Sequence, residues 1–300
     1  MSIFQRIDLS LLPQPKVVEQ ISYEQILSEL KAELISRDPQ LAEVLALESE
    51  PLVKLLQVYA FREMRSRQRE NQKAISLMLA FATGSDLDQL GANYGVPRLL
   101  LDSGNPAAIP PVPPTYESDD NFKRRIQLSF EAFTTAGSEA SYMFHGLSAD
   151  GQVADISALS PTPGVVAIYV LARTGNGHAD TPLLTKVENA LSAKTVRPLT
   201  DQVNVYSVDV LDFVVHAELI LFNGPDSALV LANAQTELDN YLAASRSNGL
   251  DITISGLHHA LHQQGVQRVN LISPSSDIVI QRHQVGHCVS QTLTVVGAND

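Results

Sequence analysis

A run of more than thirty residues, from Pro51 to Gly84, has no glycine or proline between its ends. Such a run predicts one long helix, because those two residues are the strongest helix breakers. Ser49 is expected to cap this helix, Glu50 suits the positive end of the helix dipole, and Pro51 is tolerated in the first turn. At about 1.5 Å per residue the helix would approach ~50 Å, so an elongated helical part is expected.

The residue pattern changes along this predicted helix. Residues 62–73 are almost wholly polar, and residues 75–81 are apolar again. A helix that is polar all round bridges two packed regions or lies against another chain, so a strut or a bundle is favoured over a pocket. Two shorter helices with a frayed join are the alternative. The start of the helix carries an apolar seam of Leu52, Leu55, Leu56 and Tyr59.

Four cations fall close to one face of the polar stretch, namely Arg62, Arg65, Arg69 and Lys73. One interpretation is a solvated face whose charge Glu63 and Glu70 balance locally. The other is a stripe that docks on an acidic surface, which an acidic chain that self-associates would offer. Nucleic acid ranks third, because no aromatic side chains are interleaved with the cations. The apolar seam and these cations together form the predicted partner interface.

Shorter elements are predicted on either side of the long helix. A helix is expected from Ser22 to just before Asp38, with its apolar residues on one stripe. Residues 102–114 include five prolines and few large side chains, which predicts a linker or an extended arm that serves as a hinge. Another helix is expected to open at Ser118 and to continue through Phe133.

The second half of the chain contains an internal repeat. Residues 153–162 match residues 266–275, and the same offset carries Val165-Val166 onto Ile278-Val279 without a gap. Both copies place apolar residues on two sides of a Ser-Pro pair, which predicts a strand, a tight turn and a second strand. A short helix is expected before each copy, so the repeat is interpreted as a helix followed by a hairpin.

These patterns predict an α+β chain in which an N-terminal helical bundle segment is followed by tandem α/β modules. The expected division has a helical region, a Pro-rich arm or linker, and a first and a second α/β module. The corresponding ranges are 1–100, 101–117, 118–208 and 209–300.

Composition indicates a folded and acidic chain. Apolar residues make up 44% of the 300 residues and charged residues 18%, which suits roughly two domains. The net charge of −12 disfavours general binding to nucleic acid. No stretch resembles a signal peptide or a membrane span, and Cys288 has no second cysteine to pair with. An unexported protein without a membrane partner is therefore expected.

No catalytic residue, cofactor or metal site is predicted. His258 and His262 are four residues apart, and on a helix they would share a face as in zinc hydrolases of the H-E-x-x-H type. The acidic residue of that motif is missing, so packing is the favoured interpretation and a metal-dependent hydrolase is the alternative function. His283, His287 and Cys288 form a second cluster, which needs further ligands from elsewhere to make a tetrahedral site.

Two further functional patterns are weak in this sequence. Gly175-Asn176-Gly177 precedes a predicted helix but lacks the glycine spacing and the Lys-Ser/Thr ending of a phosphate-binding loop, so a turn is expected there. A sugar- or receptor-binding module would present exposed aromatic side chains, but the chain has no tryptophan and is only 6% aromatic.

A series of short motifs runs nearly end to end in a specific order and spacing. They are Asp8-Leu9-Ser10, residues 47–57, residues 82–88, Glu117-Ser118-Asp119, residues 145–151, Val153-Ala154-Asp155, Arg197-Pro198 and residues 265–269. With these motifs the chain resembles the baseplate J family of contractile-tailed phages, and in particular its P2-like branch.

The resemblance implies a non-enzymatic wedge protein. Two copies would associate with a smaller tail protein I-like partner through an N-terminal helical bundle, and the α/β domains would link neighbouring wedges into a ring around the central hub and tube. Sheath-initiator and hub proteins are the other implied partners. The implied location is the baseplate of a virion tail or of a phage-tail-like particle that is assembled in the bacterial cytoplasm. The family contributes no catalytic residues.

Overall fold

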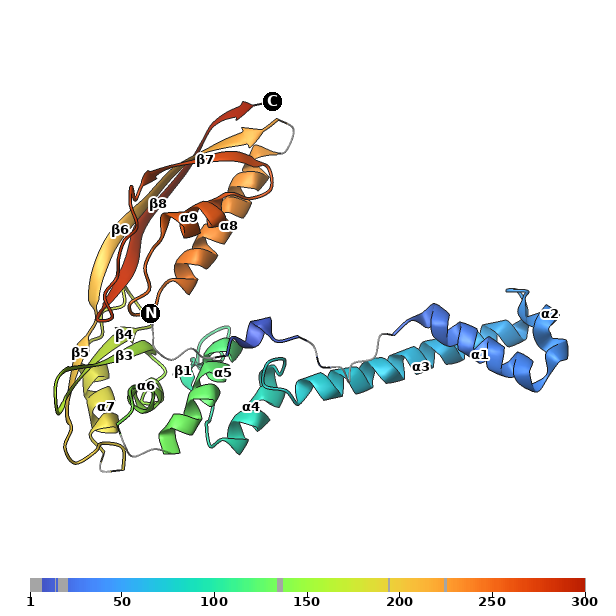
Figure 1. Ribbon diagram of the computed structural model, residues 1–300, viewed down its shortest axis with the longest axis horizontal. Helices are drawn as coiled ribbons and strands as arrows, with labels where there is room; N and C mark the ends of the chain where they lie inside the picture. Colours follow the sequence, from blue (N-terminus) through green and yellow to red (C-terminus); the bar gives the residue numbers. More distant parts are fainter. Residues whose placement is uncertain are drawn as a thin grey trace. The chain divides into compact units, whose positions relative to one another are not determined.

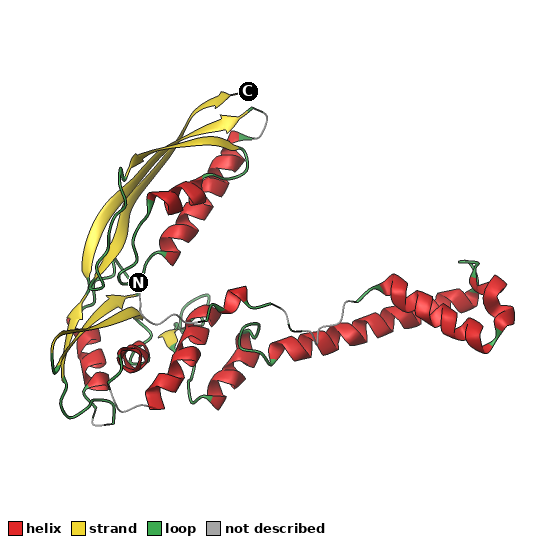
Figure 2. Cartoon of the chain, viewed as in Figure 1, coloured by secondary structure: helices red, strands yellow, loops and turns green. Residues whose placement is uncertain are grey.

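The chain consists of two compact units. One is a helical unit within residues 6–97, and the other is a mixed α/β unit that begins at Arg98. Helices and strands in mixed sheets confirm the predicted α+β class (Figure 2). The computed structural model describes residues 7–13, 15, 21–133, 137–193, 195–223 and 226–299.

The helical unit is built around a hairpin of two helices. Its elements are η1 (Leu9–Leu11), α1 (Tyr23–Arg37), η2 (Pro39–Leu41), α2 (Ala42–Leu45), α3 (Pro51–Ser76) and α4 (Gly84–Asn93). The first helix, α1, lies along α3 (Figure 1). Between them is a small core of Leu45, Val53 and Leu56, against which partly buried leucines of α1 pack. Apolar burial of this kind holds such a hairpin together.

The ends of α1 confirm the sequence prediction, and the start of α3 does not. The Ser22 hydroxyl accepts a hydrogen bond from the Gln25 amide at 3.3 Å, and α1 ends before Asp38. Ser49, in contrast, is not the cap of α3. Glu50 holds the N-cap position with an extended backbone, and Pro51 is the first helical residue. Proline is favoured at that position because its fixed φ fits the helix and its missing N–H would be unpaired there anyway.

The prediction of one helix as far as Gly84 is wrong. The long helix α3 ends at Ser76 after 26 residues, a length of about 39 Å at the usual rise. Consecutive turns follow it, in which the Phe81 and Ala82 amides both donate to the Met78 carbonyl. Ala82 is buried and no breaker precedes it. Tertiary packing therefore ends the helix where local propensity would continue it.

The first module of the mixed unit is a three-stranded sheet with helices on one face (Figure 1). Its elements are α5 (Asp119–Leu128), η3 (Ser129–Phe133), α6 (Glu139–Leu147), β3 (Val153–Thr162), β4 (Val165–Ala172), α7 (Thr181–Leu191) and β5 (Gln202–Ser207). The strand order is β3-β4-β5, with β3 antiparallel and β5 parallel to β4. The expected helix through Phe133 is wrong, because α5 stops at Leu128 and a tighter turn carries Phe130 and Phe133 to the surface.

The second module repeats the sheet with a different connectivity. Its elements are β6 (Asp209–Phe222), α8 (Ser227–Ala244), α9 (Ile254–Leu261), β7 (Val266–Ser273) and β8 (Gln284–Asn299). The strand order is β7-β6-β8, and β7 is antiparallel and β8 parallel to the central strand. The helices α8 and α9 cover one face of the sheet (Figure 1).

The predicted repeat is present as a helix followed by a strand, and its hairpin half is wrong in the second copy. The helix α6 precedes β3, and α9 precedes β7. In the first copy β3 returns directly into β4. In the second, the neighbour of β7 is already the earlier strand β6, so residues 278–279 form no return strand. Ile278 makes a single bridge with Ile252 instead.

One run of extended chain passes through both sheets. Strand β5 ends at Ser207 and β6 begins at Asp209, so Val208 alone separates them. Val208 is buried, and its amide donates to the Val170 carbonyl at 3.1 Å. It belongs to a small core with Leu171 and Val285, which come from β4 and β8. The two modules therefore share a packed joint.

The buried carboxylate of Asp155 on β3 forms polar contacts that stabilise this joint. The Arg124 guanidinium on α5 lies 2.5 Å from the Asp155 carboxylate. Ser247 donates its hydroxyl to the same carboxylate, and the Asn248 amide donates to it at 3.0 Å. Burial by itself raises the pKa of Asp155, but the Arg124 charge and these hydrogen bonds outweigh burial and hold the pKa below its usual value.

A second contact across the joint involves the loop before β8. The Ser157 hydroxyl donates to the Arg282 carbonyl at 2.5 Å. The Arg282 side chain forms an ion pair with Glu139 on α6 and donates to the Ala158 carbonyl. Residues of two elements in the first module, α6 and β3, thus hold one loop of the second.

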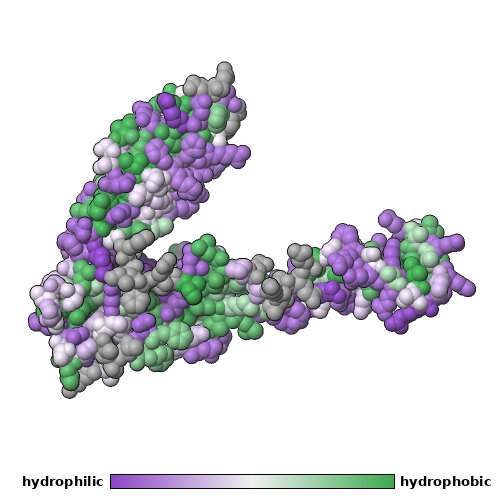
Figure 3. Space-filling model, viewed as in Figure 1, coloured by the Kyte–Doolittle hydropathy of each residue, from purple (hydrophilic) through white to green (hydrophobic). Residues whose placement is uncertain are grey.

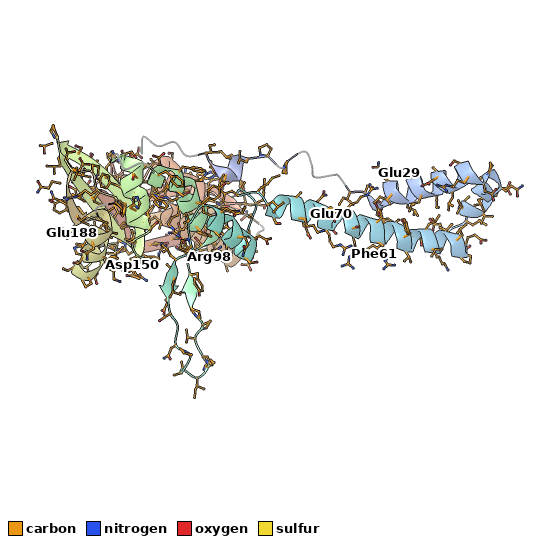
Figure 4. The ribbon with its side chains drawn as sticks, turned by 90° about the horizontal axis from the view of Figure 1, so that it is seen from below. Glu29, Phe61, Glu70, Arg98, Asp150 and Glu188 are labelled. Atoms are coloured by element: carbon orange, nitrogen blue, oxygen red, sulfur yellow. The ribbon has the colours of Figure 1, made fainter. Side chains whose placement is uncertain are left out.

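Of the two expectations for the Pro-rich segment, a linker or an extended arm, the structure has an arm in the form of a hairpin. Strands β1 (Leu100–Asp102) and β2 (Thr115–Tyr116) pair antiparallel, so the two ends of the segment lie side by side. Figure 4 shows the loop of this hairpin extending away from the two short strands. Residues 100–116 are called the finger below.

The base of the finger is held by a buried ion pair. The Arg125 guanidinium lies 2.7 Å from Glu117, and both side chains are buried. Glu117 also accepts a hydrogen bond from the Leu99 amide at 2.9 Å. Arg98 donates to the Glu117 carbonyl and forms an ion pair with Asp119 at 2.8 Å. Since both ends of the hairpin are bonded to α5 or to each other, the finger has a fixed root.

Asp155→Asn is expected to lower the free energy of unfolding by roughly 3 kcal/mol, because Arg124 loses its partner in a mostly buried place. The pKa of Asp155 is lowered in the folded chain, so its contribution is fully present above the ordinary aspartate pKa, as at neutral pH, and is lost as the pH falls through the lower folded pKa. Urea unfolding of the full chain followed by circular dichroism measures both effects.

Asp150→Asn is the matched control. Asp150 also pairs with a cation, at 2.6 Å from Lys186, but the Lys186 side chain is mostly exposed. Its loss should cost less than about 1 kcal/mol. Equal destabilisation by the two variants would contradict the role given to Asp155.

Candidate partner-docking surface

The residues of the predicted apolar seam divide between two faces of α3. Leu56 is 8% exposed and belongs to the core between α1 and α3, and Leu52 packs against that core. Leu55 is 65% exposed, and Tyr59 is also exposed. The idea of a single seam is therefore wrong, because a neighbouring helix of the same chain already covers half of it.

The exposed half is joined by Val58, which the sequence interpretation missed. Leu55, Val58 and Tyr59 are spaced three and four residues apart, so they lie side by side on one face of the helix. These three residues are called the apolar α3 face below. The sequence shows the same spacing, but it does not show which of the apolar residues α1 would cover.

All four predicted cations are exposed on α3. Lys73 is 2.9 Å from the Glu70 carboxylate, and Arg67 rather than Arg62 or Arg65 forms the ion pair with Glu63, at 3.0 Å. Within the part of the chain that the structure describes, no ion pair is formed by Arg62, Arg65 or Arg69. Glu70 thus pairs with one of the four predicted cations, and Glu63 pairs with none of them.

On the face that Figure 3 shows, the helical unit is mostly hydrophilic, with a hydrophobic patch near the far end of the α1–α3 hairpin. Figure 4 labels Glu29 on α1 and Phe61 on the side of α3 that faces away from α1. Phe61 is another exposed large apolar residue of this helix. A helix whose second face is apolar at one end and basic farther on is suited to contact with another chain.

The histidine pair of the alternative function does not share a helical face. Helix α9 ends at Leu261, and His262 follows with a non-helical backbone. His258 lies on the helix, and its carbonyl accepts the His262 amide. Among the described residues, no three His, Cys, Asp or Glu side chains are placed to hold a metal ion. The geometric premise of the hydrolase is therefore not met.

The other histidine cluster is also spread over separate contacts. The ring centroid of His283 lies 5.6 Å from that of Tyr169, and its Nε2 atom lies 3.7 Å from an Asp209 carboxylate oxygen. His287 and Cys288 line a shallow hollow in the second module. Burial raises the pKa of the Cys288 thiol, which disfavours the thiolate form that metals bind.

Buried ionisable groups in the mixed unit have structural partners. The Tyr142 hydroxyl donates to Asp201 at 2.8 Å, and burial followed by the Asp201 charge raises the pKa of Tyr142. The hollow next to Glu117, Arg124 and Arg125 has a volume of only about 10 Å³, which is about the least that holds one water molecule. These groups stabilise the fold and do not converge on a substrate-sized cavity.

Helices that could cross a membrane are absent from the part of the chain that the structure describes.

Comparison with known proteins identifies the family. The Baseplate J-like N-terminal domain matches residues 48–105, the Baseplate J-like central domain matches residues 134–207, and the Baseplate J-like protein C-terminal domain matches residues 213–296. The chain is 45% identical to Baseplate protein J of Escherichia phage P2 over 299 residues, which cover 98% of this chain and 99% of that protein. The chain belongs to the baseplate J family.

Among solved structures, a chain in the cryo-EM structure of the anti-feeding prophage (AFP) baseplate, 6-fold symmetrised, is similar with a TM-score of 0.44 and 15% identity. The similarity covers 61% of this chain and 44% of the anti-feeding prophage chain, so this protein spans less than half of that one.

Membership of the baseplate J family identifies the chain as a structural protein of a phage-type baseplate. A structural role also agrees with the features described above, which are an exposed face of α3 and packed contacts between the two modules. The apolar α3 face and the cations beyond it are the candidate docking surface, because they combine exposed apolar area with free positive charge.

Leu56→Ala and Leu55→Ala form a matched pair that tests the two faces of α3. Leu56→Ala is expected to destabilise the helical unit by roughly 2–4 kcal/mol, because it leaves a cavity between α1 and α3. Leu55→Ala should change stability by less than about 0.5 kcal/mol, since this side chain is mostly in water. Limited proteolysis of α1 and α3 in the full chain measures both. Equal sensitivity of the two variants would contradict the assignment of faces.

Proposed function

We propose that this baseplate J family member is a wedge subunit of a contractile-tail baseplate, and that its role is to hold other chains together. Two copies associate with a smaller tail protein I-like partner through the helical unit. The α/β modules then link neighbouring wedges into a ring around the central hub and tube. Family membership supports the baseplate role, and the surfaces of α3 support the wedge contact.

The observation that carries the wedge proposal is the uncovered second face of α3. One side of this helix is filled by α1, and the opposite side still presents Leu55, Val58 and Tyr59 to solvent. Burying an exposed large apolar side chain contributes roughly 1.5–3 kcal/mol. A hairpin that is apolar on both faces is stable in water with one face covered, and a helical bundle with other chains would cover the second.

The free cations extend the same contact electrostatically. Arg62, Arg65 and Arg69 lie in the half of α3 beyond Tyr59, on a chain whose net charge is −12. An acidic surface of a partner or of a second copy suits this stripe. Charged contacts of this kind set orientation and association rate more than affinity, and salt weakens them.

The rest of the assembly follows from the same proposal. The ring contacts are assigned to the two modules, and the sheath-initiator and hub proteins are the further partners. The proposed location is the baseplate of a virion tail or of a phage-tail-like particle, assembled in the bacterial cytoplasm. The functional division into residues 1–100, 101–117, 118–208 and 209–300 belongs to this proposal.

The double variant Leu55→Asp with Tyr59→Asp tests the wedge contact. Both residues are exposed, so the chain is expected to keep its circular dichroism spectrum. Co-purification with the tail protein I-like partner from the same gene cluster should fall at least about tenfold, because each tenfold corresponds to only about 1.4 kcal/mol. Leu229→Asp, which changes an exposed leucine of α8, is the matched control and should keep the complex. Undiminished complex with the double variant would refute the contact.

Removal of the whole chain tests the baseplate role. Particles made from the same gene cluster without this chain are expected to contain tails that lack organised baseplates when viewed by electron microscopy. Tails with complete baseplates under those conditions would overturn the proposal.

A further inference from the structure

The sequence contains three asparagine–glycine pairs, Asn176-Gly177, Asn223-Gly224 and Asn248-Gly249. An asparagine in such a pair can lose its side-chain amide spontaneously, because the backbone nitrogen of the next residue attacks that amide and glycine presents no side chain in the way. Gly224 lies outside the described residues. The other two pairs differ in every contact that controls this reaction, so the structure distinguishes them.

Deamidation at an asparagine–glycine pair has two steps. In the first, the glycine nitrogen gives its proton to water or hydroxide and forms a bond to the asparagine Cγ atom. The Cγ–Nδ2 bond breaks, and ammonia leaves with a proton taken from water. In the second step, one water molecule opens the resulting succinimide ring at either carbonyl, which yields aspartate or isoaspartate. The sum is an amide plus water giving an acid plus ammonia, with no oxidation or reduction.

Three features of a fold govern the first step. A hydrogen bond from the glycine N–H to an acceptor opposes the loss of its proton, so a reactive pair leaves this N–H unbonded. The asparagine Oδ1 atom gains negative charge as the new bond forms, so a donor placed on that oxygen lowers the barrier. The Nδ2 atom leaves as ammonia, so it has to reach water.

Asn176 meets all three conditions. It is exposed, in the loop between β4 and α7, and its Nδ2 atom donates to no other described residue. Within the described part of the chain, the Gly177 amide also donates no hydrogen bond. The His178 amide donates to the Asn176 Oδ1 atom at 3.1 Å. This backbone donor lies on the oxygen that becomes negative, as in the oxyanion holes of enzymes.

Packing requires glycine at position 177. Its φ of +103° favours glycine, and a Cβ atom there would lie 2.5 Å from the Leu171 Cδ1 atom. The Gly177 carbonyl accepts the Ala172 amide at 2.8 Å, so the loop is closed on one side while the Asn176 side chain stays in water. The pair of Asn176 with a glycine therefore follows from the way this loop packs.

Asn248 meets none of the three conditions. The Gly249 amide donates to the Gln284 carbonyl at 3.0 Å, so the attacking nitrogen is held. The Asn248 Nδ2 atom donates to the Tyr169 carbonyl at 3.0 Å in the joint between the modules. Its Oδ1 atom is buried and accepts no hydrogen bond from the described residues. Negative charge that developed on this oxygen would be unstabilised, so the fold protects Asn248.

We propose that Asn176 is a site of spontaneous deamidation in the folded chain, with isoaspartate among its products, and that Asn248 is protected. Isoaspartate adds one carbon to the main chain between residues 176 and 177. Gly175, one residue earlier, accepts the Arg246 guanidinium of the second module at 2.7 Å. The modification therefore falls where a loop of the first module holds the second. It needs no partner or cofactor and is independent of the wedge contact.

A time course on the purified full chain at mildly alkaline pH tests the site, because hydroxide removes the proton of the attacking nitrogen. Peptide mapping by mass spectrometry follows the conversion of each asparagine, and labelling with an isoaspartate methyltransferase detects isoaspartate. Asn176 is expected to react at least about tenfold faster than Asn248, which corresponds to a difference of about 1.4 kcal/mol in the barrier.

The same chain in guanidinium chloride is the matched control. Unfolding removes the contacts of both sites, so Asn176 and Asn248 are expected to react at similar rates there. Asn176→Gln confirms the assignment, because glutamine would have to close a larger ring. In the folded variant, isoaspartate at position 176 should be lost.

Isoaspartate is also expected to disturb the loop around it. The Ala172 amide is bonded to the Gly177 carbonyl beside the modified position. Its hydrogen exchange should be faster in chains that carry isoaspartate at position 176 than in unmodified chains.

Other results would overturn the proposal. Asn176 that stays intact in the folded chain but reacts in guanidinium chloride would show that the fold protects it. Equal rates at Asn176 and Asn248 in the folded chain would show that the contacts named above do not control the reaction. Aspartate without isoaspartate would show direct hydrolysis by water and exclude attack by the Gly177 nitrogen.

Discussion

A carboxylate buried between two sheets stays charged only with a cation and several hydrogen-bond donors around it, and Asp155 has both. Arg124 comes from α5, and Ser247 and Asn248 come from the turn after α8, so one side chain joins elements that are far apart in sequence. Because an unpaired buried charge is costly, any separation of the two modules exposes this group or strips it of partners. The packing of the two modules against each other therefore depends on this group and its partners.

Local signals in the sequence predicted much of the fold. The Ser22 cap, the helices before β3 and β7 and the strand at residues 213–222 follow from capping chemistry and apolar periodicity. The errors share one physical cause, which is that partners distant in sequence decide the outcome. Packing ends α3 at Ser76 without a breaker, and the earlier strand β6 takes the place beside β7 where a hairpin was expected. Periodicity reports which residues are apolar but not what will cover them.

Which surfaces stay exposed also depends on partners that are distant in sequence. Leu55 and Leu56 are identical and adjacent, yet one is in the core and the other in water, and only the position of α1 distinguishes them. The prolines of residues 102–114 predicted an extended segment. Composition does not show that Tyr116 pairs with Leu100 across two antiparallel strands, which makes the segment a hairpin. The hollow beside Cys288 combines β6, α8 and β8, so no local motif could reveal it.

The single residue between β5 and β6 has a mechanical consequence. Large rotations between domains need loop residues that absorb changes in φ and ψ, and Val208 is buried and hydrogen-bonded in the joint. The extended backbone from Gln202 to Phe222 therefore connects the two sheets without a flexible loop between them. If the proposed particle changes shape, we expect the two modules to turn as one body and the backbone angles that change to lie outside this strand.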